Sequence, residues 1–311
     1  MMMLTGWLVH ATLNLYMVAE MAIAKTVVLP QGWNEFAIQA FMGLTLLPVI
    51  FAFSVRLFPL YLRLRAPEWP VRMIAWFYLM ALSVQLSPTL PFLQNQAPEL
   101  MLDLSSAGAI MKGSVILWFV WKLDLLTRRR LPWTVNRVFQ PAPDRRPTRP
   151  GLPDYGEFGR FERLVYGAYI WLVLASLFEM HAGASVLWKF SAPHSSDVSR
   201  HMYLLGFISQ LILGMAVRMI PGFIGRQRIA SAKLVEASFW LVNIAAICRV
   251  LPLVVPTTML EHYPGFLSIA QVTFAFSGLL GMGAVICLMI NLWKTASPKK
   301  AREFVHVSRT S

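Results

Sequence analysis

The sequence has few charged residues and almost no cysteine. Only 14% of its 311 residues are Asp, Glu, Lys or Arg, whereas 57% are hydrophobic, and the mean hydropathy is +0.56. A water-soluble domain needs a charged surface, so this composition predicts a protein that has lipid as its solvent. The two cysteines, Cys248 and Cys287, both lie inside apolar runs, which excludes a disulfide framework and a CxxC metal site.

Other absences disfavour whole classes of function. The sequence contains no phosphate-binding loop and no pairing of a nucleophile with a base, which disfavours hydrolases and kinases and leaves enzyme status open. The net charge of +13 would suit nucleic acid, but the basic residues occupy short segments between apolar runs. We therefore expect the lipid bilayer, and no nucleic acid, as partner.

Eight apolar runs are long enough to cross a bilayer as helices. They span about 4–29, 36–60, 71–92, 101–126, 164–190, 200–224, 234–255 and 265–293. The segments after the second, fourth, sixth and eighth runs are rich in Arg and Lys, whereas the alternate segments are poor in both. The positive-inside rule then predicts a bacterial inner-membrane protein with both termini in the cytoplasm.

Residues of the first half recur, in order, in the second half. The matches include Val55, Arg56 and Pro59 with Val217, Arg218 and Pro221 at an offset of 162, and Gly108 and Gly113 with Gly278 and Gly283 at an offset of 170. We predict an all-α polytopic protein built from two tandem, parallel four-helix repeats. The expected divisions are a first repeat at 1–126, a basic Pro-rich cytoplasmic hinge at 127–163, a second repeat at 164–293 and a basic cytoplasmic tail at 294–311.

Four of the six histidines lie toward the predicted outer face, where Arg249 ends the seventh run. They are His181, His194, His201 and His262. The first-half positions that match His201 and Arg249 are Gln39 and Gln85, so only the second half carries this group. Imidazole binds haem iron and copper, and an Arg suits a haem propionate. The alternative is a set of interfacial histidines that bind nothing.

Three ionisable residues lie deeper in the apolar runs, namely Glu20, Lys112 and Glu179. A charge at the bilayer centre costs at least about 2.5 kcal/mol, so these residues are functional candidates. Small residues surround Lys112, which predicts that it faces another helix, with a carboxylate such as Glu20 to neutralise it. A buried ion pair and a route for protons or a ligand are both open interpretations.

The sixth run carries a pattern that resembles the NnrS family, whose members are haem- and copper-containing membrane proteins linked to the nitric oxide response. The matching residues are His201, Gly206, Arg218, Gly222, Gly225 and Arg226, followed by Arg249 and Val250. All spacings of the family pattern are kept. One departure is Phe223, which stands where the family has a histidine after Gly222. The sequence is also shorter than NnrS proteins, which have about twelve spans.

The resemblance implies haem b, or copper, near the outer face, in nitric oxide handling or associated electron transfer. His201 would be an axial ligand, His181 or His262 its partner and Arg249 a propionate contact, with a redox protein or a small gaseous ligand as partner. One alternative is a transporter or channel-like protein that uses Lys112, Glu20 and Glu179, with Arg218 as a further intramembrane candidate. The other alternative is a cofactor-free anchor or assembly subunit of a larger complex.

Overall fold

The computed structural model describes residues 2–62, 64, 67–94, 97–127, 157–191, 197–255 and 264–297, and these residues form helices and short connections without a strand. The helices of the first half are α1 (Met2–Ala24), α2 (Gln31–Ala40), the π-helix η1 (Phe41–Leu46), α3 (Leu47–Tyr61), α4 (Val71–Leu86), the 3₁₀-helix η2 (Ser87–Thr89), α5 (Pro91–Gln94) and α6 (Pro98–Leu123). Those of the second half are α7 (Glu162–Leu187), α8 (Asp197–His201), the π-helix η3 (Met202–Ser209), α9 (Gln210–Phe223), α10 (Ala232–Val254) and α12 (Pro264–Ala296).

Seven helices in the described part of the chain are long and apolar enough to cross a membrane. They are Met3–Ala24, Gln31–Tyr61, Pro98–Leu123, Glu162–Leu187, Asp197–Phe223, Ala232–Val254 and Gly265–Ala296. The remaining predicted run, 71–92, contains α4, whose 16 residues reach about 24 Å, less than the roughly 30 Å of a bilayer core. The prediction of an all-α membrane protein is thus confirmed, while the eighth span stays a prediction.

Local sequence accounts for several helix ends. Pro30 and Pro70 precede α2 and α4, and a proline fits there because the first turn of a helix has no use for its missing N–H. Ser231 caps α10 by accepting a hydrogen bond from the backbone N–H of Leu234 at 3.4 Å. Asp124 ends α6 in the left-handed conformation, at a φ of 58°.

A π-helical segment interrupts the second long helix of each half. Such wide turns disturb the regular hydrogen-bond ladder and expose carbonyl groups to other donors. In η1 the carbonyl of Gly43 accepts a hydrogen bond from the Tyr78 hydroxyl at 2.8 Å. In η3 the Ser209 hydroxyl donates to the carbonyl of Leu204 at 2.9 Å. Each segment is therefore stabilised by a side-chain hydroxyl.

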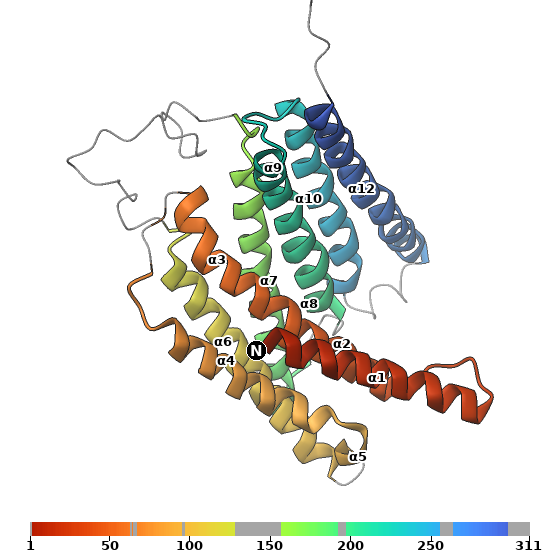
Figure 1. Ribbon diagram of the computed structural model, residues 1–311. Coiled ribbons are helices and arrows are strands. Elements are labelled where there is room, and N and C mark those ends of the chain that lie inside the picture. The colour runs from red at the N-terminus through yellow and green to blue at the C-terminus, as the bar shows by residue number, and fades with distance from the viewer. Residues whose placement is uncertain are drawn as a thin grey trace, which may run out of the picture.

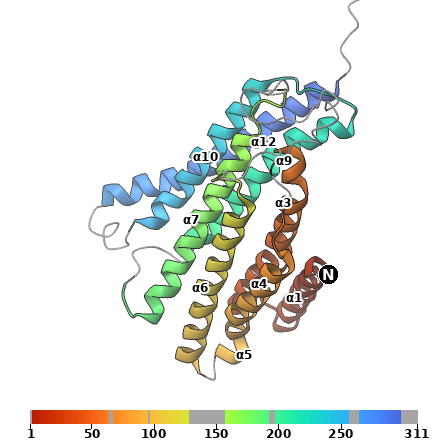
Figure 2. The same ribbon diagram turned by 90° about the vertical axis from the view of Figure 1, so that its left-hand side faces the viewer.

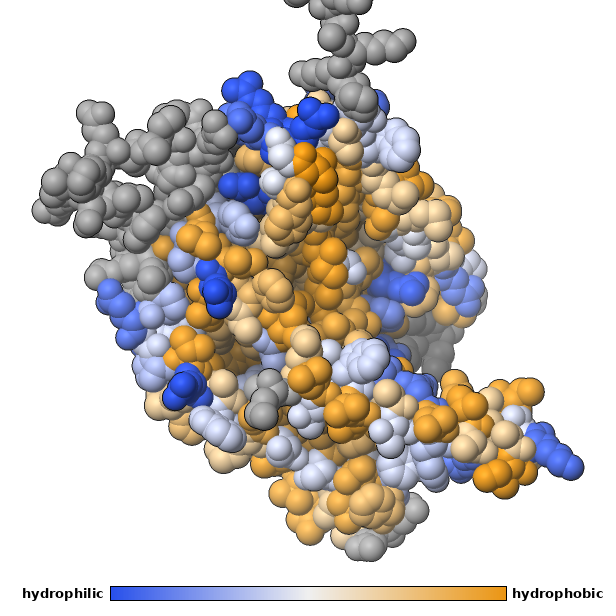
Figure 3. All heavy atoms as spheres, in the orientation of Figure 1, coloured by the Kyte–Doolittle hydropathy of each residue, from blue (hydrophilic) through white to orange (hydrophobic). Residues whose placement is uncertain are grey.

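The two halves meet along α6 and α7, which lie side by side near the centre of the bundle (Figures 1 and 2). Helix α1 packs on α2 and η1, and α12 packs on α10, so that both lie at the edges. Their apolar spans are only 6% and 11% buried, and hydrophobic atoms dominate much of the surface in Figure 3. In a bilayer, these side chains face lipid tails, so their exposure is expected.

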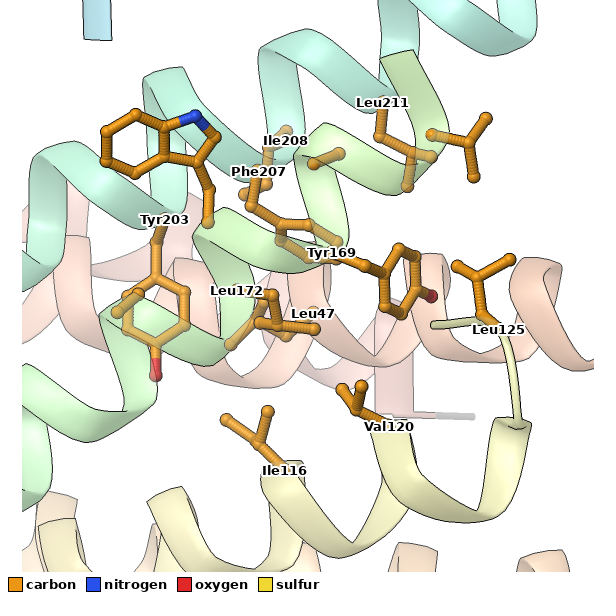
Figure 4. Packing of buried hydrophobic residues seen from close by; sticks show 14 of the residues in the cluster. Leu47, Ile116, Val120, Leu125, Tyr169, Leu172, Tyr203, Phe207, Ile208 and Leu211 are labelled. Atoms are coloured by element: carbon orange, nitrogen blue, oxygen red, sulfur yellow. The ribbon is translucent and has the colours of Figure 1, made fainter. Parts of the chain in front are cut away.

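Buried residues of both halves pack together in the centre of the bundle, and Figure 4 shows Tyr169 and Phe207 of the second half beside Leu47, Ile116 and Val120 of the first. The Tyr169 ring of α7 lies edge-on to Phe58 of α3 at 5.6 Å and to Phe207 of η3 at 5.3 Å. All three rings are buried, and edge-to-face pairs add about 0.5–1.5 kcal/mol each beyond the area they bury. Leu47 and Leu172 complete an apolar layer that joins the first half to the second.

Candidate functional site

An ion pair between Lys112 of α6 and Glu179 of α7 lies in the interior between the two halves. The Lys112 Nζ is 2.6 Å from the Glu179 Oε1, and the two side chains are only 8% and 12% exposed. Both residues were singled out from the sequence, but the expectation that Glu20 neutralises Lys112 is wrong. Glu20 lies on α1, which packs on α2 and η1, whereas α7 runs directly along α6.

Glu179 accepts hydrogen bonds from three side chains of three different elements. Lys112 at 2.6 Å and the Gln85 Nε2 of α4 at 2.8 Å both donate to Oε1, and the Tyr203 hydroxyl of η3 donates to Oε2 at 2.8 Å. The Tyr203 hydroxyl also lies 3.4 Å from the Ser176 Oγ. Both carboxylate oxygens of Glu179 therefore accept hydrogen bonds within the cluster.

Three glycines let these helices approach closely enough for the cluster to form. A Cβ added to Gly108 would lie 2.3 Å from the backbone N of Gln85, and one added to Gly183 would lie 2.6 Å from the carbonyl O of Ser106. At Gly113 an added Cβ would lie 2.4 Å from the Met180 Cγ. Helix α6 can thus touch α4 and α7 only because these positions lack side chains.

A polar cavity of about 510 Å³ opens beside the ion pair. Its lining includes Lys112, Glu179, Gln85 and Tyr203 at the cluster, Ser105 and Ser106 on α6, and Glu35, Gln39, Asp197, Ser199 and Arg200 on α2 and α8. Arg200 pairs with Asp197 at 3.3 Å. The cavity thus extends from polar side chains of α2 and α8 to the ion pair inside the bundle.

The cluster has unused hydrogen-bonding capacity next to this cavity. A lysine ammonium has three N–H donors, and within the described residues only Glu179 accepts a hydrogen bond from Lys112. The Gln85 Oε1 is buried and has no hydrogen-bond partner in that part of the chain. A small molecule that both accepts and donates hydrogen bonds would match these two groups.

His201 and Arg249 lie against the same aromatic ring, that of Phe274 on α12. The guanidinium of Arg249 on α10 lies 3.9 Å from the ring centroid, and its Nη1 donates to the Phe274 carbonyl at 3.4 Å. The partly buried His201 ring lies edge-on to Phe274 with 6.0 Å between centroids. The structure therefore brings together two of the residues that were predicted to form a cofactor site.

The other predicted members of that site have different surroundings. His181 is exposed on α7, and its ring lies 5.4 Å from that of Phe190. His262 and His194 fall outside the described residues. Within those residues, no group of three or more His, Cys, Asp or Glu side chains could hold a metal ion. The haem and copper ligands proposed from the sequence stay predictions.

Arg218, the last sequence candidate, lies between two aromatic rings. Its guanidinium is 4.8 Å from the Tyr61 ring centroid and 4.3 Å from that of Phe158, and the residue is 9% exposed. This stacking joins the end of α3 to the segment that precedes α7. Arg56, which matches Arg218 in the first half, is exposed.

Two central residues of the ion-pair cluster, Gln85 and Tyr203, were not identified as site residues from the sequence. Gln85 was noted only as the neutral counterpart of Arg249, and Tyr203 only as part of the motif that begins at His201. A useful signal was available, because both are polar residues inside apolar runs. Such residues need a partner within the protein.

The chain was compared with known protein families and with curated proteins. The family model described as NnrS protein matches residues 159–292, from just before α7 to within α12. No curated protein matches the chain. The matched segment contains Glu179, Tyr203, His201 and Arg249 but neither Lys112 nor Gln85. The resemblance identified in the sequence is confirmed, and the ion pair joins the matched segment to the half that precedes it.

Proposed function

We propose, on the premise that residues 159–292 form an NnrS-family region of a polytopic membrane protein, that the polar cavity is its working site and binds a small hydrophilic ligand. The observation that carries this proposal is the Lys112–Glu179 pair at the inner end of the cavity. Replacing a buried ion pair by apolar residues of similar volume is often neutral or stabilising, so stability alone does not explain such a pair. A charged pair within the spans, next to an open polar space, therefore favours a ligand or proton site.

The ligand that fits is a small polar molecule with both acceptor and donor groups. Its acceptor would bind the free N–H groups of Lys112, and its donor would bind the Gln85 Oε1. Passage across the bilayer would require the apolar layer of Leu47, Leu172 and Phe207 to open. The proposal thus corresponds to a transporter-like or channel-like protein whose binding site lies between two halves.

Cysteine accessibility tests this proposal. In a C248S/C287S background, Ser105→Cys should react with a charged, membrane-impermeant methanethiosulfonate added to intact cells, because Ser105 lines the cavity. Ser238→Cys is the control, since Ser238 is 2% exposed on α10 and bonds the Ala284 carbonyl. A rate at Ser105→Cys no higher than at Ser238→Cys would show that the cavity is closed to water and overturn the proposal.

A second candidate function is binding of haem b, or of copper, at His201 in a nitric oxide response or associated electron transfer. The supporting observation is that His201 and Arg249 lie against Phe274 within the NnrS-family region. These residues would supply an axial imidazole and a propionate contact. A Soret band in the purified protein that disappears in His201→Ala is expected. Protein without such a band, purified from haem-replete cells, would exclude haem and leave copper, the ligand site and the cofactor-free anchor.

We further propose that the chain crosses a bacterial inner membrane eight times, as two parallel repeats, and that both termini lie in the cytoplasm. In support, η1 and η3 fall at corresponding places of the second helix of each half, and Pro59 and Pro221 lie near the ends of α3 and α9. Reporters fused after Arg146 and near Asp197 should lie on opposite sides of the membrane. The same side for both would contradict this topology.

A further inference from the structure

A second cavity, of different character, separates α3 of the first half from α9 of the second. It is an open groove of about 520 Å³, and among the described residues that line it only Thr45 and Ser54 are polar. The Ser54 hydroxyl donates to the Ile50 carbonyl at 2.7 Å and accepts a hydrogen bond from Tyr169 at 2.5 Å. Thr45 is buried against Gly6 of α1. The other described residues that line the groove have hydrocarbon or thioether side chains, which donate no hydrogen bond.

The two walls of the groove correspond to each other residue by residue. The paired residues are Leu46 with Ile208, Val49 with Leu211, Ile50 with Ile212, Phe53 with Met215, Ser54 with Ala216, Leu57 with Met219 and Phe58 with Ile220. Every pair is separated by 162 residues, the offset at which Val55, Arg56 and Pro59 recur in the sequence. The groove therefore presents nearly equivalent apolar faces on both sides.

We infer that this groove binds a hydrocarbon chain of a membrane phospholipid. Both walls belong to helices that are long and apolar enough to span the bilayer, so the space between them is reached from lipid rather than from water. Phe53, Ile212 and Phe223 remain 55%, 59% and 76% exposed, and hydrophobic atoms cover this face in Figure 3. Two similar walls that are apolar apart from Thr45 and Ser54 suit a hydrocarbon chain, which has no polar groups.

Arg226, which follows α9 near one end of the groove, complements a phosphate headgroup. The groove reaches Phe223, the last residue of α9, and the backbone N–H of Arg226 folds back to bond the Pro221 carbonyl at 2.8 Å. The Arg226 guanidinium donates to the Ala296 carbonyl at 3.2 Å, which leaves further N–H groups at an exposed position. A lipid whose chain fills the groove would place its phosphate within reach of this cation.

The groove is separate from the polar cavity, so this inference does not depend on the proposed ligand site. The apolar layer of Leu47, Leu172 and Phe207 lies between the cluster that contains Tyr203 and the region near Leu211 (Figure 4). The Tyr203 hydroxyl donates a hydrogen bond to Glu179 on the cavity side, whereas the Tyr169 hydroxyl donates one to Ser54 in the groove wall. A bound chain would fill the space between the halves that protein side chains leave open.

Photocrosslinking tests the assignment. The full chain would be reconstituted in vesicles that contain phosphatidylglycerol with a diazirine near the middle of one acyl chain. Labelling should be enriched on peptides with Met215 and Met219 relative to the peptide with Met282, which is 62% exposed on α12. Ala216→Trp should reduce groove labelling and leave Met282 labelling unchanged. Ile244→Trp, at a 44% exposed position of α10 outside the groove, is the matched control and should change neither.

A mass measurement of the intact purified protein completes the test. The wild-type protein should retain one phospholipid, and Ala216→Trp should lose it. Ala216→Leu provides a smaller change in case the tryptophan variant does not fold, and it should weaken retention. Groove labelling equal to that of Met282, unchanged labelling in the variants, a retained isoprenoid chain, or crosslinks to a second copy at the groove would each overturn the inference.

Discussion

The ion-pair cluster and the His201 cluster differ in how their members are held. Lys112, Glu179, Gln85 and Tyr203 come from four elements in both halves and join through bonds of 2.6–2.8 Å. His201 and Arg249 come from the second half and lie against the same Phe274 ring, and among the described residues no hydrogen bond between their side chains is found. A charge deep in a bilayer must find a partner within the protein, whereas a histidine near a helix end can use water. Depth therefore predicts that a residue has a hydrogen-bond partner within the protein, although it does not tell which residue that partner is.

Replacing Lys112 should cause the largest loss of stability of the variants considered. If stability did not fall, the contrast between the two clusters would not hold. Lys112→Met introduces the residue found at the matched position 282, and it leaves the Glu179 charge buried without a cation. Loss of one partner of a buried pair costs about 3–5 kcal/mol, so thermal unfolding in detergent should occur at a much lower temperature. The double variant with Glu179→Gln should recover part of the loss. An unchanged unfolding temperature for Lys112→Met alone would contradict a structural ion pair.

Removing the Tyr203 hydroxyl should have an intermediate effect. Tyr203→Phe deletes the hydrogen bond to the Glu179 Oε2, and a bond to a charged group contributes about 1.5–3 kcal/mol. Tyr61→Phe is the control, because its ring, which stacks on Arg218, is kept. The control should change the free energy of unfolding by about 0.5 kcal/mol or less. Equal effects in the two variants would show that the Tyr203 bond adds no stability.

The matched glycines Gly108 and Gly278 sharpen the comparison between the halves. Gly108→Ala would press a methyl group against the Gln85 backbone, and overpacking of this kind costs about 1–3 kcal/mol. Gly278→Ala meets nothing within 4 Å and should be nearly neutral. Unfolding of both variants in the same detergent measures the difference. Similar stabilities would mean that the close approach of α6 and α4 is not required.

The sequence predicts where the helices lie along the chain better than it predicts which helices pack against each other. The runs at 164–190 and 200–224 correspond to Glu162–Leu187 and Asp197–Phe223, because a long apolar run has few alternatives to a spanning helix. The run at 71–92 is not one continuous α-helix, because α4 ends at Leu86 and is followed by a 3₁₀ turn that contains Pro88. The π-helical segments have no recognisable signal in the apolar pattern.

The sequence predicts only part of the candidate site, namely its two charged residues. Lys112 and Glu179 stand out because charges are rare in apolar runs, but their depth does not tell which helices are adjacent. Glu20 was therefore chosen as partner, although α1 packs on α2 and η1. The sequence does not identify Gln85 and Tyr203 as site residues, because neutral polar residues are cheaper to bury than charges and therefore give a weaker signal in an apolar run.

Replacing His201 should have the smallest effect on folding, and this prediction separates a cofactor site from a structural one. His201→Ala removes an edge-on contact at 6.0 Å from a partly buried ring, and an aromatic pair contributes about 0.5–1.5 kcal/mol. The unfolding temperature of the cofactor-free protein should thus fall much less than in Lys112→Met. His10→Ala is the matched control, because His10 also lies against an aromatic ring, Phe41, at 4.5 Å.

The Soret band and the unfolding temperature of these histidine variants report on different roles of the residue. If His201 is an axial ligand, His201→Ala should abolish the Soret band, whereas His10→Ala should keep it, since a ligand acts through its iron bond and not through packing. A loss of stability in His201→Ala as large as in Lys112→Met would show instead that Phe274 and His201 are part of the supporting structure. In that case both clusters would be required for folding. They would then differ only in the kind of group that each can bind.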